Sequence, residues 1–328
     1  MAEMTLIEAI RTALDEALAQ DERVFVTGED IGRRGGVFRA TQGLYEKYGA
    51  RRVMDSPLTE MGIIGVGIGA ALADLRPVCE IQFADFIHPA FNQIVGEAAR
   101  MYYRSAGGWQ VPLVIRVPYG AVPGGGLYHC QSVEALFAHI PGLKIVVPST
   151  PRDARRLLHG AILDPNPVLF LETKYGYRQI RGEVPEQDAP LLPGPARIAR
   201  EGGDLSLFAW GLMAFYAEIA AERAAQEDGL DVEVVDLRTL HPLDQESVLG
   251  SLRKTGKALV VHEDTRTMGF GAEIAALLVD EAFEYLDGPV KRLTAPDVPA
   301  APFNRGMFDY FLPGPDDIFA AIRELAAY

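Results

Sequence analysis

The sequence is poor in cysteine and has no long hydrophobic run. Its only cysteines are Cys79 and Cys130 in 328 residues. Two cysteines are too few for the disulfide framework of a small secreted protein, so we expect a reducing compartment and a cytoplasmic location. No apolar run reaches the length that crosses a membrane, and the first residues lead directly into an expected helix. We therefore expect no membrane partner and no signal or transit peptide.

Positive charge is also scarce. The chain carries 31 Lys and Arg against 45 Asp and Glu, a formal net charge of −14. This balance disfavours nucleic acid or an anionic membrane as a general partner. Arginines do gather at 33–34, 51–52 and 152–156, where pairing with acids on the surface or between subunits is the ordinary explanation. The patterns H-x-x-x-H, C-x-x-C, Walker A and G-x-S-x-G are missing, so the commonest zinc, phosphate-loop and serine-hydrolase sites are not indicated.

Short apolar runs alternate with helical patterns along the whole chain. This predicts an α/β fold with two domains, each a mostly parallel sheet covered by helices. A proline-rich stretch without periodicity, 182–198, is the expected linker between a first domain at 1–181 and a second at 199–328. The expected strands are 24–28, 53–55, 77–82, 112–117, 144–148, 167–172, 205–211, 232–237 and 258–263. The expected helices are 6–20, one starting at Glu60, 91–103, 132–139, 151–163, 213–226, 244–255, 271–285 and 316–327.

The most informative segment is 56–72, where Ser-Pro-Leu-Thr-Glu-Met-Gly leads into a helix of small and apolar residues. It places the carboxylate of Glu60 at the entrance of a helix with almost no other polar side chain. A carboxylate there is costly unless it has a partner or a task. Such a glutamate suits a hydrogen bond to a ring nitrogen of a cofactor. The plainer interpretation is a first-turn glutamate favoured by the helix dipole, and the local sequence leaves both open.

The glycines of this helix do not indicate a nicotinamide cofactor. Gly65, Gly67 and Gly69 resemble a dinucleotide loop, but the fingerprint needs a third glycine where Leu72 stands. It also needs an acid about 20 residues further on, and Glu80 is only loosely placed for that role.

A second notable segment runs from Gly124 to Ser132 and contains His129. It reads as a flexible glycine-rich loop that ends in a histidine at a helix start. Histidine titrates nearest to neutral pH, and loops on a rigid scaffold often carry catalytic groups. A histidine that merely satisfies backbone groups is the ordinary alternative. Cys130 is an improbable nucleophile, because neighbouring side chains on a helix point about 100° apart.

Two further segments are ambiguous. Phe83 and Phe86 follow a strand and could stack against a heteroaromatic ring, although core packing is the commoner role of such rings. The turn that contains Asp164 and Asn166 follows a helix end whose carbonyls are free, which suits a hard or weakly hydrated cation. An ordinary Asx turn explains the same residues.

Six segments occur in a fixed order along nearly the whole chain: Val26–Asp30, Pro57–Gly62, Gln82–Phe86, His129–Ser132, His139–Lys144 and Asp236–Asp244. Their order and spacing resemble the β subunit of the thiamine diphosphate-dependent 2-oxo acid dehydrogenase decarboxylase. The resemblance implies a transketolase-like pyrimidine-binding domain followed by a transketolase C-terminal-like domain. It also implies decarboxylation of a 2-oxo acid and reductive acylation of a lipoyl group.

The resemblance implies a role for each matching residue. Glu60 matches the glutamate that hydrogen-bonds the aminopyrimidine and favours the imino tautomer, which takes the proton from the thiazolium carbon. Phe86 matches the aromatic residue packed on the pyrimidine, and Glu29 matches less firmly a residue at the cofactor edge. His129 matches the histidine that assists acyl transfer to the lipoyl arm. The residues that match the potassium site, the first three through backbone carbonyls, are Leu113, Ala161, Ile162, Asp164 and Asn166.

The chain departs from the family pattern in two places. Cys130 stands where serine is usual after the histidine, which could change local hydrogen bonding or redox sensitivity. The chain also has no G-D-G followed by N-N, the pattern that holds Mg²⁺ and the diphosphate in thiamine enzymes. We therefore expect this chain to bind the pyrimidine half only. A separate α subunit would then hold Mg²⁺ and the diphosphate in an α₂β₂ heterotetramer, which is inactive as β alone and docks on the lipoyl acyltransferase core.

The substrate class is narrowed by three segments. Residues 104–109, 127–129 and 135–139 resemble the branched-chain enzymes more than pyruvate dehydrogenase.

Two other functions are alternatives to this one. A self-contained transketolase-type enzyme is disfavoured by the missing diphosphate pattern. A non-catalytic α/β oligomerisation subunit is disfavoured because Glu60 and His129 are both present.

Overall fold

The computed structural model describes residues 2–328, which form two compact units. Unit 1 comprises the chain up to Tyr119 together with Leu136–Pro193, and unit 2 comprises Gly120–Ala135 and Gly194–Tyr328. The chain passes from one unit to the other at 193–194, within the expected linker. The grouping of 120–135 with the C-terminal half was not part of our sequence-based division. Within the described residues, no helix combines the length and the apolarity that a membrane span requires.

Unit 1 is built on a parallel sheet. Six strands pair side by side in the order β6-β7-β5-β4-β2-β3, and neighbouring strands run parallel to one another. A separate antiparallel pair joins β1 to β8. The strands are β1 (Ala2–Thr5), β2 (Val24–Gly28), β3 (Val53–Asp55), β4 (Arg76–Glu80), β5 (Val114–Tyr119), β6 (Lys144–Val146), β7 (Val168–Thr173) and β8 (Arg181–Val184).

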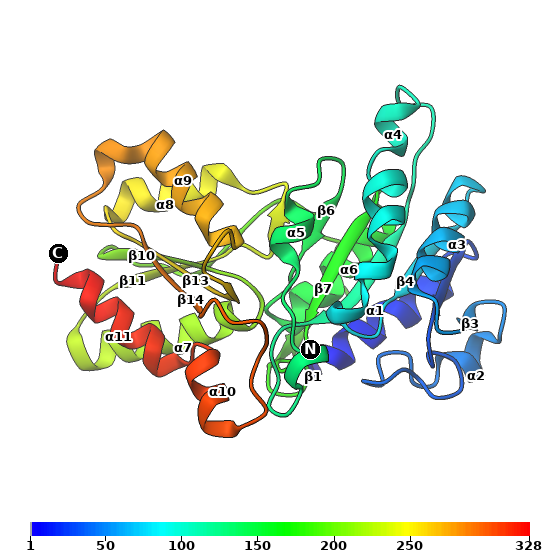
Figure 1. The fold of residues 1–328 in the computed structure, drawn as a ribbon, viewed down its shortest axis with the longest axis horizontal. Helices are drawn as coiled ribbons and strands as arrows, with labels where there is room; N and C mark the ends of the chain where they lie inside the picture. Colours follow the sequence, from blue (N-terminus) through cyan, green and yellow to red (C-terminus); the bar gives the residue numbers. More distant parts are fainter. Residues whose placement is uncertain (1) are drawn as a thin grey trace. The chain divides into compact units, whose positions relative to one another are not determined.

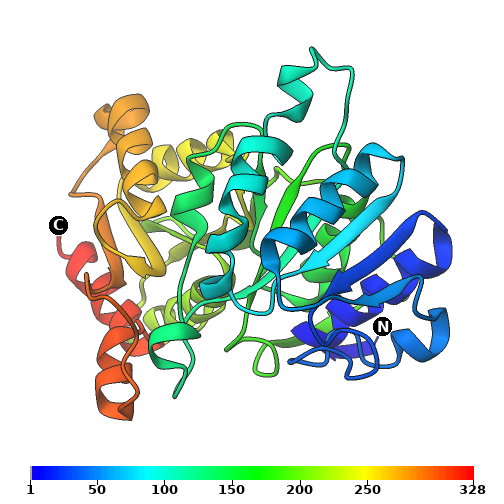
Figure 2. The same ribbon diagram turned by 45° about the vertical axis from the view of Figure 1, so that its right-hand side comes forward.

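Helices cover this sheet because each buries an apolar face. In α1, Thr5 caps the first turn in a reciprocal capping box with Glu8, and the apolar face packs on α6. Figure 2 shows α3 lying beside the helical segment 88–98, which it contacts. The α-helices that lie in unit 1 or begin at its boundary are α1 (Leu6–Gln20), α2 (Leu44–Tyr48), α3 (Glu60–Leu72), α4 (Met101–Arg104), α5 (Glu134–Ala138) and α6 (Pro151–Leu163).

One strand in this region was not expected, and two helix predictions were wrong. Residues 2–5 lead directly into α1, as expected, but they also form a strand because 181–184 supplies an antiparallel partner. The single helix expected over 91–103 is interrupted by a π-helical segment, Gln93–Ala98, before α4 begins. There the amide of Ala99 donates to the carbonyl of Ile94 at 2.9 Å, one residue further back than an α-helix allows. The helix expected over 132–139 is limited to α5.

Unit 2 is a smaller sheet between two helical layers. Its strands pair in the order β14-β13-β10-β11-β9, all parallel except the edge strand β9. Figure 1 shows α7 with α11 on one face and α8 with α9 on the other, in agreement with their contacts. Its elements are β9 (Arg197–Arg200), β10 (Leu205–Ala209), α7 (Gly211–Asp228), β11 (Val232–Asp236), β12 (Thr239–His241), α8 (Gln245–Thr255), β13 (Ala258–Thr265), α9 (Phe270–Ala282), β14 (Lys291–Ala295), α10 (Arg305–Phe311) and α11 (Pro315–Ala326).

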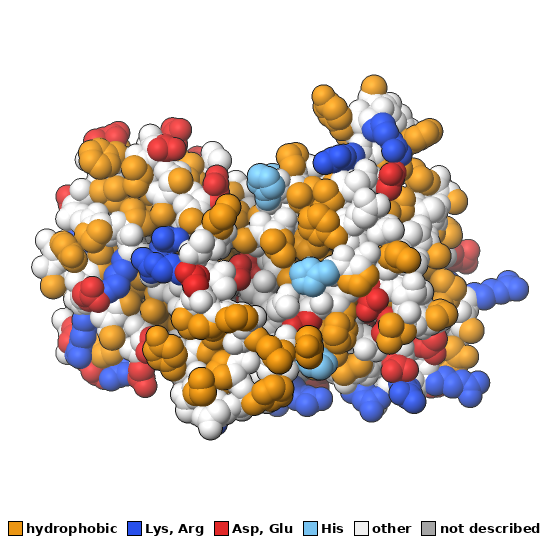
Figure 3. Space-filling view, viewed as in Figure 1, with side chains coloured by type: hydrophobic (Ala, Val, Ile, Leu, Met, Phe, Trp, Pro, Cys, Tyr) orange, Lys and Arg blue, Asp and Glu red, His pale blue; other side chains and the backbone are white. Residues whose placement is uncertain are grey.

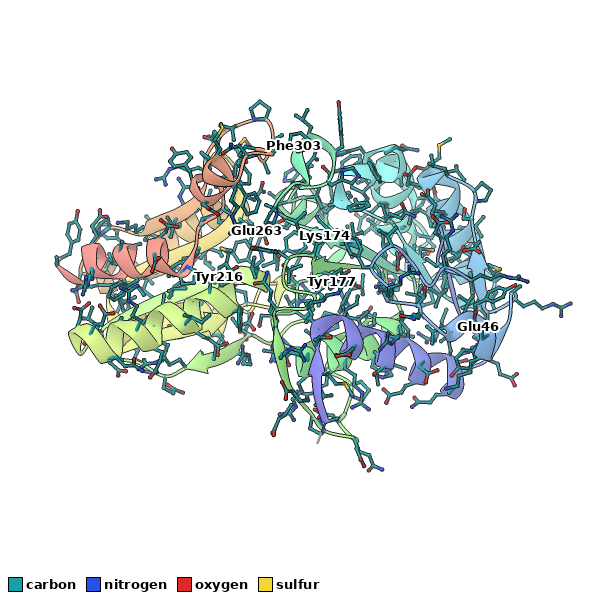
Figure 4. All side chains as sticks on the ribbon, turned by 90° about the horizontal axis from the view of Figure 1, so that it is seen from below. Glu46, Lys174, Tyr177, Tyr216, Glu263 and Phe303 are labelled. Carbon is teal, nitrogen blue, oxygen red and sulfur yellow. The ribbon has the colours of Figure 1, made fainter. Side chains whose placement is uncertain are left out.

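A buried ion network lies within the sheet of unit 1. The guanidinium of Arg116, on β5, is fully buried and donates to Glu172 on β7 at 2.7 and 2.8 Å. It also donates to Glu80 on β4 at 2.6 Å. The hydroxyl of Tyr177 donates to Glu172 at 2.5 Å, and Figure 4 labels this tyrosine together with Lys174, just after β7. The network therefore cross-links three adjacent strands.

Candidate active site

The carboxyl ends of β3, β2 and β4 bring three of the sequence-predicted residues to one edge of the unit 1 sheet. Glu29 follows β2 directly, Glu60 opens the helix after β3, and Phe86 ends a short 3₁₀ turn after β4. The side-chain amide of Gln82 donates to the backbone carbonyl of Glu29 at 3.2 Å, which connects the loop after β4 to the loop after β2. In parallel α/β sheets this edge is where ligands bind.

Glu29 and Glu60 form a pair of interacting carboxyls. Burial, and then the negative charge of Glu60, raise the pKa of Glu29, while a hydrogen bond from the Thr59 backbone opposes the shift. Glu29 is only 8% exposed, and its Oε1 is buried without a hydrogen-bond partner in the described structure. A buried carboxyl oxygen without a partner is costly. This edge of the sheet is therefore suited to a polar group that supplies hydrogen-bond donors.

The helix α3, which begins at Glu60, has one buried face and one exposed face. Thr59 occupies the N-cap position, but its side chain makes no capping hydrogen bond. One face of the helix is buried, and Gly67 lets it approach Cys79 and Leu113. On the opposite face Val66 is 57% exposed, and added methyl groups at Gly65 and Gly69 would meet nothing within 4 Å. That face can receive another backbone at close range.

Aromatic rings line the same edge. Phe86 lies edge-to-face with Phe83 at a centroid distance of 5.5 Å, and Phe83 contacts Phe38 at 5.3 Å. The ammonium of Lys174 lies 5.9 Å from the centroid of the Phe83 ring. Because Phe86 is only partly buried, part of its ring surface remains open for packing against a flat group.

The expected cation site lies at the opposite edge of this sheet, where β5 and β7 begin. The guanidinium of Arg76 donates to the carbonyl of Ile162 at 2.5 Å, and Asp164 forms an ion pair with Lys144. Asp164 also accepts from the amide of Asn166 at 2.9 Å, which is the Asx turn considered above. Across residues 2–328, no cluster of three or more His, Cys, Asp or Glu side chains is arranged to hold a metal ion.

His129 lies in unit 2, in the loop of residues 120–135, hereafter the histidine loop. It follows a 3₁₀ turn, Gly126–Tyr128, and four residues separate it from the start of α5. The histidine therefore ends a turn instead of beginning a helix. The thiol of Cys130 exchanges hydrogen bonds with the backbone N–H and carbonyl of Val122, both at 3.4 Å, so this thiol is used to close the loop. The structure thus places Glu29, Glu60 and Phe86 together in unit 1, and His129 in unit 2.

Sequence reasoning missed a group of buried acids in unit 2. Glu134 and Glu263 are 0% and 3% exposed, and burial raises the pKa of Glu134 well above its usual range, with the charges of Asp264 and Glu263 adding to the effect. Burial likewise raises the pKa of Asp264 to about 6. The available signal was a carboxylate directly after an apolar strand run, Val260-Val261-His262-Glu263.

We expect Asp264 to make the free energy of unfolding depend on pH. A carboxyl whose pKa is raised on folding contributes stability below its unfolded pKa, and this contribution is lost as the pH rises through the folded value. The window here runs from 3.8 to about 6. Because an amide stays neutral, we expect Asp264→Asn to gain about 2 kcal/mol relative to the unmodified chain between pH 4 and pH 7.

The measurement is urea unfolding of both proteins at several pH values. The amide oxygen of asparagine can still accept the bond that Asp264 accepts from Thr265 N–H at 2.7 Å, so packing is preserved. Gln110→Ala, at an exposed residue that does not titrate, provides the control, with an expected difference that does not vary over the same window. A constant difference between Asp264→Asn and the unmodified chain would contradict the prediction.

The two units match two known domain families. Residues 2–179 match the model of the transketolase pyrimidine binding domain, and residues 194–318 match the model of the transketolase C-terminal domain. A solved structure described as a split gene transketolase, inactive β4 tetramer, superposes with a TM-score of 0.80 at 24% identity. The superposition covers 99% of this chain and 98% of that one, and it supports the fold alone.

Full-length relatives narrow the family. The chain is 52% identical to a 2-oxoisovalerate dehydrogenase subunit beta of Bacillus subtilis, over all of both proteins. It is 47% identical to a mitochondrial 2-oxoisovalerate dehydrogenase subunit beta 2 of Arabidopsis thaliana, covering 99% of this chain and 90% of that protein. It is 44% identical to a pyruvate dehydrogenase E1 component subunit beta of Bacillus subtilis, again over all of both. The resemblance found in the sequence is thereby confirmed, and the chain belongs to the family of 2-oxo acid dehydrogenase β subunits.

Proposed function

We propose that this chain, together with an α subunit, decarboxylates a branched-chain 2-oxo acid on thiamine diphosphate and passes the acyl group to a lipoyl group. The observation that carries the proposal is the carboxyl pair at the edge of the unit 1 sheet, where Glu29 has a buried oxygen without a partner beside Glu60. A donor-bearing heterocycle fits that edge. When bound, thiamine diphosphate supplies a carbon nucleophile and an acceptor for the electron pair released with CO₂.

Each residue of the chain has a distinct task in this proposal. Glu60 accepts a hydrogen bond from the pyrimidine ring and holds or releases a proton at its carboxyl oxygen, as a general acid–base group does. Glu29 disfavours a second negative charge nearby and so helps to set the proton affinity of the pair. Phe86 offers its open ring surface to the flat pyrimidine. His129 assists transfer of the acyl group to the lipoyl sulfur.

The branched-chain substrate is the preferred one. Its support is the higher identity to relatives named for 2-oxoisovalerate, 52% against 44% for a pyruvate-type subunit from the same organism. Pyruvate is the second candidate, because pyruvate dehydrogenase subunits also align over the whole chain.

The assembly is an α₂β₂ heterotetramer in the cytoplasm, docked on a lipoyl acyltransferase core through unit 2. Support for a subunit contact comes from the exposed face of α3, where Met61 and Val66 lie more than half exposed beside Gly65 and Gly69. Figure 3 shows hydrophobic side chains gathered over α10 in unit 2. The exposed ones there include Phe303, Met307 and Tyr310. Surfaces of this kind mark protein contacts.

Two metal ions complete the proposal. The α subunit holds Mg²⁺ with the diphosphate, because this chain lacks the G-D-G and N-N pattern. A potassium ion is held in unit 1 by the carbonyls of Leu113, Ala161 and Ile162 with Asp164 and Asn166. Each carbonyl has a second lone pair beyond the hydrogen bond it already accepts. Arg76 and Lys144 already supply positive charge at this turn. Because like charges repel, we expect the potassium ion to bind weakly.

Potassium should therefore stabilise the chain modestly. We expect replacement of 100 mM NaCl by 100 mM KCl to raise the midpoint of thermal unfolding by about 2 °C, because a ligand bound only by the folded state stabilises it. Differential scanning calorimetry at constant ionic strength measures the shift, and choline chloride provides the ion-free reference. Equal midpoints in all three salts would remove the potassium site from the proposal.

The decisive test of the function mixes this chain with its candidate α subunit, Mg²⁺ and thiamine diphosphate. Reduction of an artificial electron acceptor is followed with 2-oxoisovalerate and with pyruvate, each also with either subunit alone. Activity only in the mixture, and higher with the branched-chain acid, is the expected result. A stable complex without activity on any 2-oxo acid would favour the non-catalytic alternative, and activity of this chain alone would favour a self-contained thiamine enzyme.

A further inference from the structure

The histidine loop is closed on itself within unit 2. The amide of Gly120 donates to the carbonyl of Gln131 at 2.9 Å, which joins the two sides of the loop at its base. The thiol of Cys130 bridges to both backbone groups of Val122. His129 lies between these fastenings and the tip of the loop. The glycine-rich segment that the sequence suggests is flexible is therefore a structured element.

Glu263 fastens the entrance of this loop. Its carboxylate, at the end of β13, accepts a hydrogen bond from the buried amide of Ala121 at 2.9 Å. Gly120, with φ +85°, packs directly on it, since an added Cβ would lie 2.4 Å from the carboxylate oxygen. A positive φ and this close approach both require glycine at position 120. Figure 4 labels Glu263 within unit 2. The backbone at Gly120 and the carboxylate of Glu263 are therefore in close contact at the entrance of the loop.

Glu134 fastens the exit of the loop. Its Oε1 accepts a hydrogen bond from the indole N–H of Trp210 at 3.2 Å. Trp210 is 1% exposed and stacks on the buried ring of His262, with centroids 5.2 Å apart and planes inclined by 13°. Phe270 contacts the same indole edge-to-face at 5.8 Å. A side chain held by rings on two sides gives the loop a fixed point of attachment.

The tip of the loop contacts an aromatic ring. Gly126 has φ +58°, and a Cβ there would lie 2.1 Å from the ring of Phe303, which Figure 4 also labels. A pocket of about 350 Å³ adjoins the loop and is lined by Leu127, Gln131, Glu263 and Ala301 among others. The loop therefore contacts the rest of unit 2 at its entrance, tip and exit, and it borders a pocket.

We propose that Glu263 is a positioning residue for the proposed reaction: by holding Ala121 N–H and the Gly120 turn, it sets the place of His129 for acyl transfer to the lipoyl group. The inference rests on the proposed role of His129. Removing the carboxylate leaves a buried amide without a partner, and the loop must move to satisfy it. Acyl transfer then loses orientation, whereas the carboxyl pair of unit 1 keeps its groups.

The test compares two rates on the complete α–β assembly. One is 2-oxo acid-dependent reduction of an artificial acceptor, and the other is reductive acylation of a lipoylated domain of the acyltransferase. We expect Glu263→Ala to lower the ratio of lipoyl acylation to acceptor reduction about tenfold, the effect of one lost buried hydrogen bond. Glu263→Gln should restore the ratio, because its amide oxygen still accepts from Ala121. Exposed Glu281→Ala on α9 is the matched control with an unchanged ratio.

A second set of variants distinguishes a displaced histidine loop from a misfolded protein. Gly120→Ala disturbs the same joint from the backbone side, so it should lower the ratio as Glu263→Ala does, and thermal unfolding checks that both assemblies remain folded. His129→Ala combined with Glu263→Ala should transfer acyl groups no more slowly than His129→Ala alone. A ratio within twofold of the unmodified assembly in Glu263→Ala, or independent losses in the double variant, would overturn the inference. Unchanged lipoyl acylation in His129→Ala would overturn the proposed role of His129 itself, and the inference with it.

Discussion

Glu60→Gln should reduce 2-oxo acid-dependent activity of the α–β assembly by about 10²- to 10⁴-fold, the usual contribution of a positioned acid–base group. Glutamine keeps the shape of the side chain at the start of α3, but it cannot take up the proton at a carboxyl oxygen. Replacing the glutamate also removes the negative charge that raises the pKa of Glu29. The pKa of Glu29 should therefore fall toward its ordinary value. Steady-state reduction of an artificial acceptor, with saturating thiamine diphosphate, measures the effect.

The matched control is Glu46→Gln. Glu46 is an exposed glutamate in α2 of the same unit and is labelled in Figure 4. This change should leave the rate within twofold. Gel filtration establishes that both variants still assemble with the α subunit. If the Glu60→Gln assembly retained activity within a few-fold of the unmodified protein, the proton-transfer role of Glu60 would be wrong and the helix-dipole interpretation would stand.

Arg116→Met should destabilise unit 1 by about 3–5 kcal/mol, because it leaves two buried carboxylates without their cation. Glu80 and Glu172 are 4% and 0% exposed, and the guanidinium donates to both. Methionine fills much of the volume of the arginine stem but satisfies neither acid. Urea unfolding of the purified chain at pH 7 measures the loss.

Two further variants make the experiment specific. Arg34→Met removes a guanidinium that is 77% exposed and contacts Asp30 at 3.4 Å, so its effect should remain within about 1 kcal/mol. The triple variant Arg116→Met with Glu80→Gln and Glu172→Gln should recover part of the stability, since no buried charge remains unpaired. A loss from Arg116→Met no larger than that from Arg34→Met would mean that the network contributes nothing measurable.

Much of the fold could be predicted from the sequence because the strongest patterns are local. The Thr5 cap and an apolar face predict the helix at 6–20, and the strands at 24–28 and 53–55 lie where the apolar runs predict them. Features that depend on distant partners were missed. The strand at 2–5 exists only because 181–184 pairs with it. The strand at 291–295 also went unrecognised, since it lies at the edge of the sheet with half-buried residues.

The candidate site was predictable to a similar extent and for similar reasons. Glu60 stands out in sequence because it is a charge at the entrance of an apolar helix. The interaction between Glu29 and Glu60, and the hydrogen bond from Ala121 to Glu263 at the base of the histidine loop, could not be predicted from spacing. The amide of Ala121 and the carboxylate of Glu263 meet across 142 residues of chain. Such contacts follow from the tertiary fold, which periodicity and capping signals do not encode.

The interleaved course of the chain has a consequence for inheritance by recombination. Unit 2 takes Gly120–Ala135 from the first half of the sequence and the remainder from Gly194 onward. In a gene formed by a single crossover near residue 194 between two relatives, the histidine loop would come from one parent. The elements that it contacts, β13, the Trp210 indole and the Phe303 ring, would come from the other parent. Natural variation at positions 120–134 and at Trp210, Glu263 and Phe303 is therefore expected to change in concert, as one inherited block divided between two places in the gene.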